Sequence, residues 1–121
     1  MARLRKEVSH RWERRMLLRA WRQGEVDRDS ICDADFLLVE ASKYHGYPAE
    51  RACPVCEGDT LREVNWIYGD RLGKRSNTAR REEEIVRIVE EVGPVTVHLV
   101  EVCTRCRWNH LLETGTVEPG G

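Results

Sequence analysis

Four cysteines arranged as two pairs are the residues of this sequence with the clearest chemistry. Each pair is a Cys-x-x-Cys motif, one at 53–56 and the other at 103–106. Such pairs bind Zn²⁺ through four thiolates, each about 2.3 Å from the ion. Four thiolates fill the tetrahedral sphere and leave no position for a substrate or an activated water. The sequence therefore predicts one structural zinc ion per chain, held by Cys53, Cys56, Cys103 and Cys106.

Other chemistry at the same sulfurs stays open. Thiolates also bind iron and oxidise reversibly, so an iron site or a dithiol redox switch is the alternative. The fifth cysteine, Cys32, is expected to be a small buried apolar residue rather than a ligand or a nucleophile. His110 follows the second motif closely. Because four cysteines already complete the ligand set, we expect His110 beside the ligands or on the surface.

Length and composition bound the class of protein. A chain of 121 residues with 40% apolar and 34% charged residues is typical of a single soluble globular domain. The first residues carry charge without an apolar segment behind them, and the run free of charge between Glu91 and Glu101 is too short to cross a bilayer. We therefore expect a single cytoplasmic domain over 1–121 with no membrane partner, in which cysteines stay reduced and bind metal.

The N-terminal part, residues 1–48, is predicted to be basic and helical. Residues 1–22 contain eight Lys or Arg against two Glu, a net charge of +6 in a chain whose formal charge is −1. We predict a helix over 4–23, with Leu18 among the arginines of its cationic side. That side is either solvated or a binding site for phosphate or an acidic protein. The packing side is expected to hold Trp12, Met16, Leu17, Ala20 and Trp21, and the candidates for partner binding are Arg11, Arg14, Arg15 and Arg22.

A second N-terminal helix is predicted over 31–44. Apolar residues recur there at steps of three and four, which is the spacing of one helix face. The segment ends at a Gly-Tyr-Pro turn. The predicted apolar stripe of this helix consists of Phe36, Leu37, Ala41 and Tyr44.

The segment 49–117 is predicted to form an α+β zinc ribbon, a small antiparallel sheet that carries the two cysteine turns. Gly58 is expected to supply the positive φ that such a turn needs. Because 46 residues separate the inner cysteines, more than a compact ribbon requires, we expect a helix inserted between the first two strands. The predicted elements are a strand at 61–68, the inserted helix at 78–92, strands at 95–102 and 108–113, and a frayed tail at 118–121.

Several segments together resemble an uncharacterised family of small actinobacterial proteins, a zinc-ribbon-like domain of unknown function. The most specific is the run Trp108-Asn109-His110-Leu111 after the second motif, and a Cys-Asp-Ala step at 32–34 is similar as well. The resemblance covers nearly the whole chain. It implies a fold and a lineage, but it transfers no catalytic residue.

The predicted function is that of a non-enzymatic zinc-ribbon binding or adaptor protein. The closed metal site, the cationic helix and the aromatic residues Trp66, Tyr68 and Trp108 point to a macromolecular partner, nucleic acid or a nucleoprotein assembly, although core packing is the alternative for the aromatics. No catalytic motif and no small-molecule substrate is identified. The alternatives are a redox or metal-responsive regulator that uses the same thiolates, and a small enzyme with an unrecognised site.

Overall fold

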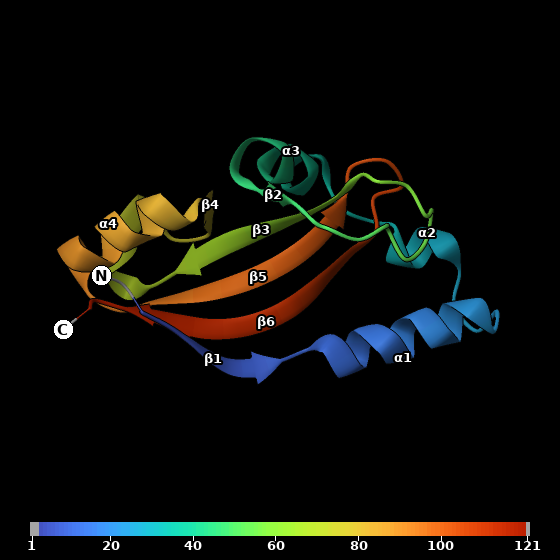
Figure 1. Cartoon of the computed structure of the whole chain (residues 1–121), viewed down its shortest axis with the longest axis horizontal. Helices are drawn as coiled ribbons and strands as arrows, with labels where there is room; N and C mark the ends of the chain where they lie inside the picture. Colours follow the sequence, from blue (N-terminus) through green and yellow to red (C-terminus); the bar gives the residue numbers. More distant parts are fainter. Residues whose placement is uncertain (1–2, 121) are drawn as a thin grey trace.

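The computed structural model describes residues 3–120, and for residues 3–7 it describes the backbone alone. Within this part, six strands form one antiparallel sheet of order β1-β6-β5-β3-β2, and β4 also pairs with β3 (Figure 1). The predicted mixture of helices with an antiparallel sheet is confirmed. The elements are β1 (Arg3–Ser9), α1 (Arg11–Arg22), α2 (Arg28–Ile31), α3 (Phe36–His45), β2 (Tyr47–Pro48), β3 (Leu61–Tyr68), the 3₁₀ helix η1 (Asp70–Arg75), β4 (Thr78–Arg80), α4 (Glu82–Val92), β5 (Val95–Cys103) and β6 (Asn109–Glu118).

The pair β3 and β5 is the centre of the sheet. Their register runs from Leu61 opposite Cys103 to Tyr68 opposite Thr96, so both strands are paired over their whole length. β-branched residues fill β5, as expected for a strand that is buried on parts of both faces. β4 and α4 lie between these two strands in the chain, which is the predicted insertion.

The inserted helix begins later than the sequence predicts. Residues 78–80 form β4, which pairs with β3, and α4 begins at Glu82. The Glu84 carboxylate accepts a hydrogen bond from the backbone N–H of Arg81 at 3.3 Å and so fixes the start of the helix. Pairing with β3 satisfies backbone groups that a helical turn at 78–80 would have used internally.

The predicted helix over 4–23 is wrong at its beginning. Residues 3–9 form strand β1, which pairs with β6 at the edge of the sheet, and the helix starts only at Arg11. An unpaired β6 edge offers backbone groups that outweigh the weak local preference of this charged segment for helix. The same pairing extends β6 to Glu118, which lies opposite Arg3, so the predicted frayed tail begins inside the sheet. The N-terminal part therefore is not an independent helical pair.

The second predicted helix is divided in two. α2 ends at Ile31, and α3 begins at Phe36 because the Asp35 carboxylate accepts a hydrogen bond from the backbone N–H of Leu38 at 2.7 Å. The predicted stripe is correct only at Ala41, since Phe36 and Leu37 are each 73% exposed. Tyr44 is equally exposed. The face of α3 that packs on the sheet contains Leu38, Val39, Ala41 and the fully buried Ser42.

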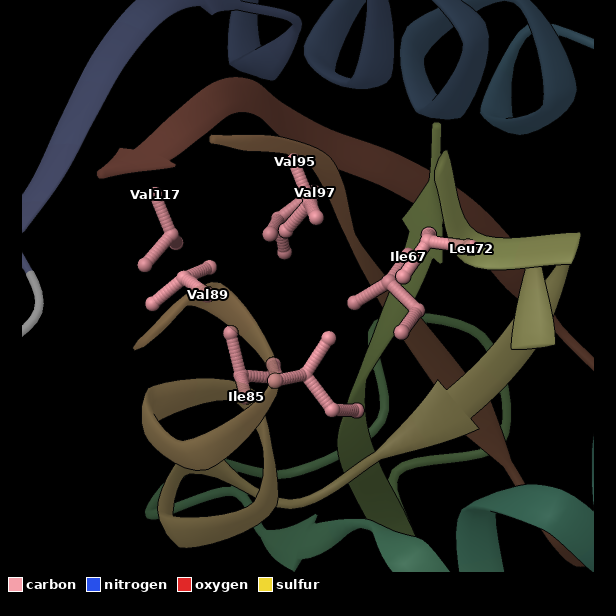
Figure 2. Packing of buried hydrophobic residues seen from close by; sticks show 8 residues of the cluster. Ile67, Leu72, Ile85, Val89, Val95, Val97 and Val117 are labelled. Atoms are coloured by element: carbon pink, nitrogen blue, oxygen red, sulfur yellow. The ribbon is translucent and has the colours of Figure 1, made fainter. Parts of the chain in front are cut away.

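The apolar core is divided between the two ends of the sheet. At one end, Ile85 and Val89 project from α4 toward Val97 and Val117 on the strands (Figure 2). Each such aliphatic side chain contributes about 1.5–3 kcal/mol when it is fully buried. At the other end, where the loops at 49–60 and 104–108 lie (Figure 1), α1 and α2 pack against the cysteines through Leu18 and Ile31. A third cluster lies under α3.

Among the residues that the structure describes, no helix is both long enough and apolar enough to cross a lipid bilayer.

Candidate metal centre

The two Cys-x-x-Cys segments form turns of the same geometry. In the first turn the backbone N–H of Glu57 donates to the carbonyl of Cys53, and in the second the N–H of Arg107 donates to the carbonyl of Cys103, both at 3.0 Å. Glu57 and Arg107 have positive φ values of 63° and 71°. The prediction that Gly58 supplies the positive φ is therefore wrong.

Gly58 has a steric role instead. A methyl group on its Cα would lie 3.5 Å from the Cys56 Sγ and 3.1 Å from the Thr60 hydroxyl. The second distance is shorter than most contacts of a real Cβ, so any larger residue would push against the cysteine turn.

Strand pairing brings the two turns together. The first turn leads into β3 and the second follows β5, so the pairing of Leu61 with Cys103 places both at one end of the sheet. Thr104 strengthens this link, because its backbone N–H donates to the carbonyl of Thr60 at 3.1 Å. Residues that are 47 positions apart in the chain, Cys56 and Cys103, thus have their Sγ atoms 3.6 Å apart.

The four predicted ligands form one compact group of sulfurs. The Sγ atoms of Cys53, Cys56, Cys103 and Cys106 all lie within 4.8 Å of one another, and Cys53 and Cys106 are 3.6 Å apart. Thiolates placed about 2.3 Å from an ion at the corners of a tetrahedron are separated by about 3.8 Å. The sulfurs therefore fit a tetrahedral ion without rearrangement of the backbone. Cys53 and Cys103 are buried, whereas Cys56 and Cys106 are partly exposed.

Hydrogen bonds to the sulfurs prepare the site for thiolates. The backbone N–H of Val55 donates to the Cys53 Sγ, and that of Cys106 donates to the Cys103 Sγ, both at 3.4 Å. The Thr60 hydroxyl lies 3.1 Å from the Cys103 Sγ. Such partners orient ligands and stabilise their charge.

The same surroundings act differently on the pKa values of the two buried thiols. Burial raises the pKa of Cys53 to about 11. Burial also disfavours the charged form of Cys103, but hydrogen bonds from the Cys106 backbone and the Thr60 hydroxyl lower its pKa to about 6. Cys103 therefore ionises more readily than Cys53.

A buried carboxylate beside the cysteines was not predicted. Glu101 has no exposed surface, and both its oxygens accept hydrogen bonds from the Arg14 Nε at 2.9 Å. The Arg51 Nη2 donates to Oε1 at 2.9 Å, and the Trp108 Nε1 donates to Oε2 at 2.7 Å. Glu101 is the single acidic residue of β5, and that isolated charge in an apolar strand was the signal in the sequence.

The remaining predicted residues of this region fall outside the group of sulfurs. The His110 Nδ1 lies 2.7 Å from the carbonyl oxygen of Leu111, and its ring stacks on Trp108, so His110 is not part of the cysteine group. Trp108 is fully buried, which confirms core packing as its role. Trp66 and Tyr68 are partly exposed on β3.

Cys32 lies next to the cysteine group without belonging to it. Its Sγ is 3.8 Å from the Cys106 Sγ, and the side chain is partly exposed. The prediction of a small buried residue is therefore only partly correct, since Cys32 packs against the cluster but keeps contact with solvent.

The structure divides the predicted cationic side of α1. Arg14 pairs with the buried Glu101, and Arg11 pairs with Glu113 at 3.3 Å. Arg15 and Arg22 are exposed. The predicted packing side is shifted as well, because the helix buries Leu18 and leaves exposed two residues that were expected to pack, Trp12 and Met16.

Comparison with known proteins places the chain among uncharacterised bacterial proteins. The model of a family of unknown function (DUF5318) matches residues 1–118. The uncharacterized protein Rv0049 of Mycobacterium tuberculosis is 39% identical over 101 residues, which cover 84% of this chain and 74% of that protein. The uncharacterized protein Mb0050 of Mycobacterium bovis has the same identity and coverage. No solved structure matches the chain.

Proposed function

The chain belongs to the DUF5318 family of unknown function, and from that premise we propose that it is a non-enzymatic zinc-ribbon binding protein that contacts nucleic acid through α1. In this proposal a structural Zn²⁺ joins the turn before β3 to the turn after β5. The rigid end of the sheet then holds α1 in place. The family match itself confirms the resemblance to an uncharacterised actinobacterial family that the sequence indicated.

The choice of Zn²⁺ is supported by the donor set. Four sulfurs at tetrahedral separations suit zinc, and a closed sphere of four thiolates has no open position for a substrate. Such an ion contributes to folding rather than to catalysis. Iron binds the same donors, so the metal content of the purified protein decides between the two.

The observation that carries the binding role is the outward face of α1. Arg15, Arg19 and Arg22 are exposed, and none has an ion-pair or hydrogen-bond partner for its side chain among residues 8–120. Trp12 is 62% exposed and Met16 is 43% exposed, and they lie three residues before Arg15 and Arg19 respectively, on the same side of the helix. The exposed tryptophan ring leaves apolar surface in contact with water. Together with the neighbouring guanidinium groups, it matches a ligand that has both negative charge and flat rings.

Nucleic acid is the partner with that combination. Guanidinium groups bind phosphates, and a tryptophan ring stacks on a base for about 1–3 kcal/mol. The inward face of the same helix is fixed by Leu18 and by the bond of Arg14 to Glu101, so binding requires no reordering of α1.

The first experiment measures the metal. The protein purified under reducing conditions is expected to contain one zinc ion per chain, and Cys103→Ser is expected to lose the ion and to unfold at a lower denaturant concentration. A native zinc content and native stability of Cys103→Ser would contradict the ligand assignment.

The second experiment measures binding to a fluorescent single-stranded oligonucleotide at two salt concentrations. Affinity is expected to fall as salt rises, and Arg15→Glu/Arg19→Glu is expected to abolish it. The matched control is Lys74→Glu/Arg87→Glu, which makes the same change in net charge at exposed positions away from α1. Equal binding by both variants, or no binding by the unaltered protein at low salt, would reject this proposal.

A further inference from the structure

The sulfur of Cys32 lies beside that of Cys106, one of the four proposed ligands, and backbone hydrogen bonds fix this position. The backbone N–H of Ala34 donates to the carbonyl of Arg107 at 3.0 Å, and the Arg107 Nε donates to the carbonyl of Ala34 at 2.6 Å. The Asn109 side chain donates to the Asp33 carboxylate at 2.9 Å. The segment after α2 is therefore tied to the second cysteine turn, and the position of Cys32 beside Cys106 is built into the fold.

The sulfurs of Cys32 and Cys106 are in van der Waals contact. The Cys32 Sγ is 3.8 Å from the Cys106 Sγ, and a disulfide needs about 2.05 Å. Cys32 is not needed to complete the proposed metal sphere, so a bond between Cys32 and Cys106 takes only one ligand from the ion. Both side chains are partly exposed, whereas Cys53 and Cys103 are buried. A small oxidant from solvent therefore reaches Cys32 and Cys106 before it reaches the buried ligands.

A positive charge accompanies this pair. Arg28, one turn before Cys32, has a pKa above its ordinary value, first because of a hydrogen bond with Cys32 and further because of the nearby Cys106. The guanidinium group of Arg28 therefore lies within reach of the Cys32 sulfur.

We propose that Cys32 and Cys106 are an oxidative modification site, in which a peroxide converts the pair to a disulfide and removes Cys106 from the metal. This inference rests on the zinc site proposed above and adds its regulation. Three thiolates then remain, and the ion is released. Because Leu18 of α1 packs in the same cluster as Cys103 and Trp108, loss of the ion also weakens the packing of α1 against the sheet.

The chemistry balances as a two-electron oxidation. The sulfur of Cys106, which would be a thiolate as a zinc ligand, attacks the peroxide; an S–O bond forms, the O–O bond breaks, and the leaving hydroxide takes a proton from solvent to become water. The Cys32 sulfur then attacks the sulfenic sulfur, the S–S bond forms, and the S–O bond breaks. The second hydroxide takes the thiol proton of Cys32. One zinc-bound thiolate, one thiol, one hydrogen peroxide and one proton from solvent thus give one disulfide and two waters.

The test compares the zinc-loaded protein with its Cys32→Ser variant under hydrogen peroxide. Released zinc is followed with a colorimetric chelator, and disulfides are mapped by mass spectrometry after alkylation. The unaltered protein is expected to release its zinc and to contain a Cys32–Cys106 disulfide, which dithiothreitol and added zinc reverse. Cys32→Ser is expected to bind one zinc with unchanged thermal stability and to release it several-fold more slowly.

Each other outcome overturns the inference. Equal release rates, with a disulfide that joins Cys53 to Cys106 or Cys56 to Cys103, would show that Cys32 has no part in the oxidation. A Cys32→Ser variant that cannot hold zinc would make Cys32 a ligand instead. If the unaltered protein holds no zinc at all, the metal site of the proposed function fails as well, whereas equal release from fully loaded proteins rejects the modification site alone.

Discussion

Glu101 is the residue on which the cysteine end of the molecule depends most directly. Its buried carboxylate receives hydrogen bonds from three different segments: Arg14 of α1, Arg51 of the loop before the first turn, and Trp108 after the second turn. A charge without exposed surface is tolerated only when it is paired and fully hydrogen-bonded. One residue therefore connects the basic helix to both cysteine turns.

Glu101→Gln is expected to lower the free energy of unfolding by about 3 kcal/mol, because the largely buried Arg14 loses its counter-charge, whereas Arg51 is more exposed and keeps Glu63 as a partner. Urea unfolding of the zinc-loaded protein measures this change. The control is Glu91→Gln, whose carboxylate is 66% exposed beside Arg75 and whose loss is expected to cost less than about 1 kcal/mol. Similar unfolding midpoints for the two variants would show that the buried network is not important for stability.

Zinc affinity is expected to weaken as the pH falls, because zinc must displace protons from the thiols. Burial raises the pKa of Cys53 to about 11 and also raises that of Cys106, so both are protonated at neutral pH. At a pH below the pKa of a ligand thiol, each proton that zinc must displace lowers the apparent affinity about tenfold for every unit by which the pH falls. Titrations against a competing chelator at three pH values measure this slope. An affinity independent of pH would contradict the assignment of thiols as ligands.

At the scale of elements, the end of α3 shows how closely helix and sheet approach. The Arg62 Nε of β3 donates to the carbonyl of Ser42 at 2.6 Å, and its Nη2 donates to the carbonyl of Gly46 at 3.0 Å. A methyl group at Gly46 would collide with the backbone oxygen of Ser42 and lie 2.8 Å from that of Glu63. Gly46 is therefore required by space and not by its φ of −99°.

Gly46→Ala is expected to destabilise the protein by about 1–3 kcal/mol, because backbone atoms must shift to admit the methyl group. The matched control is Gly69→Ala, where φ is 170° and the nearest atom to the new methyl group is a Leu72 side-chain carbon at 3.4 Å. That change is expected to be close to neutral. Thermal unfolding of both variants measures the difference. Equal losses of stability would mean that the backbone between α3 and β3 shifts at little cost to admit the methyl group.

At the scale of the whole molecule, two apolar clusters stabilise opposite ends of one sheet. The cluster around α4 contains no cysteine, whereas the cluster around Trp108 contains both buried ligands, Cys53 and Cys103. The four-cysteine group therefore belongs to the apolar cluster at the end of the sheet opposite α4 (Figure 1), and the cluster around α4 is made of aliphatic side chains (Figure 2). The two ends are expected to respond differently when the ion is removed.

Removal of zinc by a chelator is expected to accelerate hydrogen exchange at the cysteine end by at least about tenfold, and at the α4 end by less than about threefold. The informative amides are those of Cys53 and Cys103, which donate to carbonyls within their own turns, and that of Gly93, which donates to Val89. Exchange measured by NMR or mass spectrometry compares the two ends. A uniform acceleration would show that the sheet unfolds as one unit.

The sequence by itself determined which four cysteines form the candidate site and where the central strands lie. Cys-x-x-Cys spacing is local chemistry, so the four cysteines were identified without knowledge of the fold, and the structure brings them together. The apolar runs that became β3 and β5 were also predicted within a residue of their bounds, because alternation and β-branching are local signals.

Tertiary structure alone decided the role of the N-terminal segment. The strand β1 exists because β6 offers it an edge, and no pattern within residues 3–9 specifies that partner. Long-range contacts likewise decided which arginines of α1 are free, since Arg14 finds its partner 87 positions away at Glu101. They also placed Cys32 beside Cys106, 74 positions along the chain. Local propensity cannot contain such information, because residues so distant in sequence become neighbours only when the strands of the sheet pair.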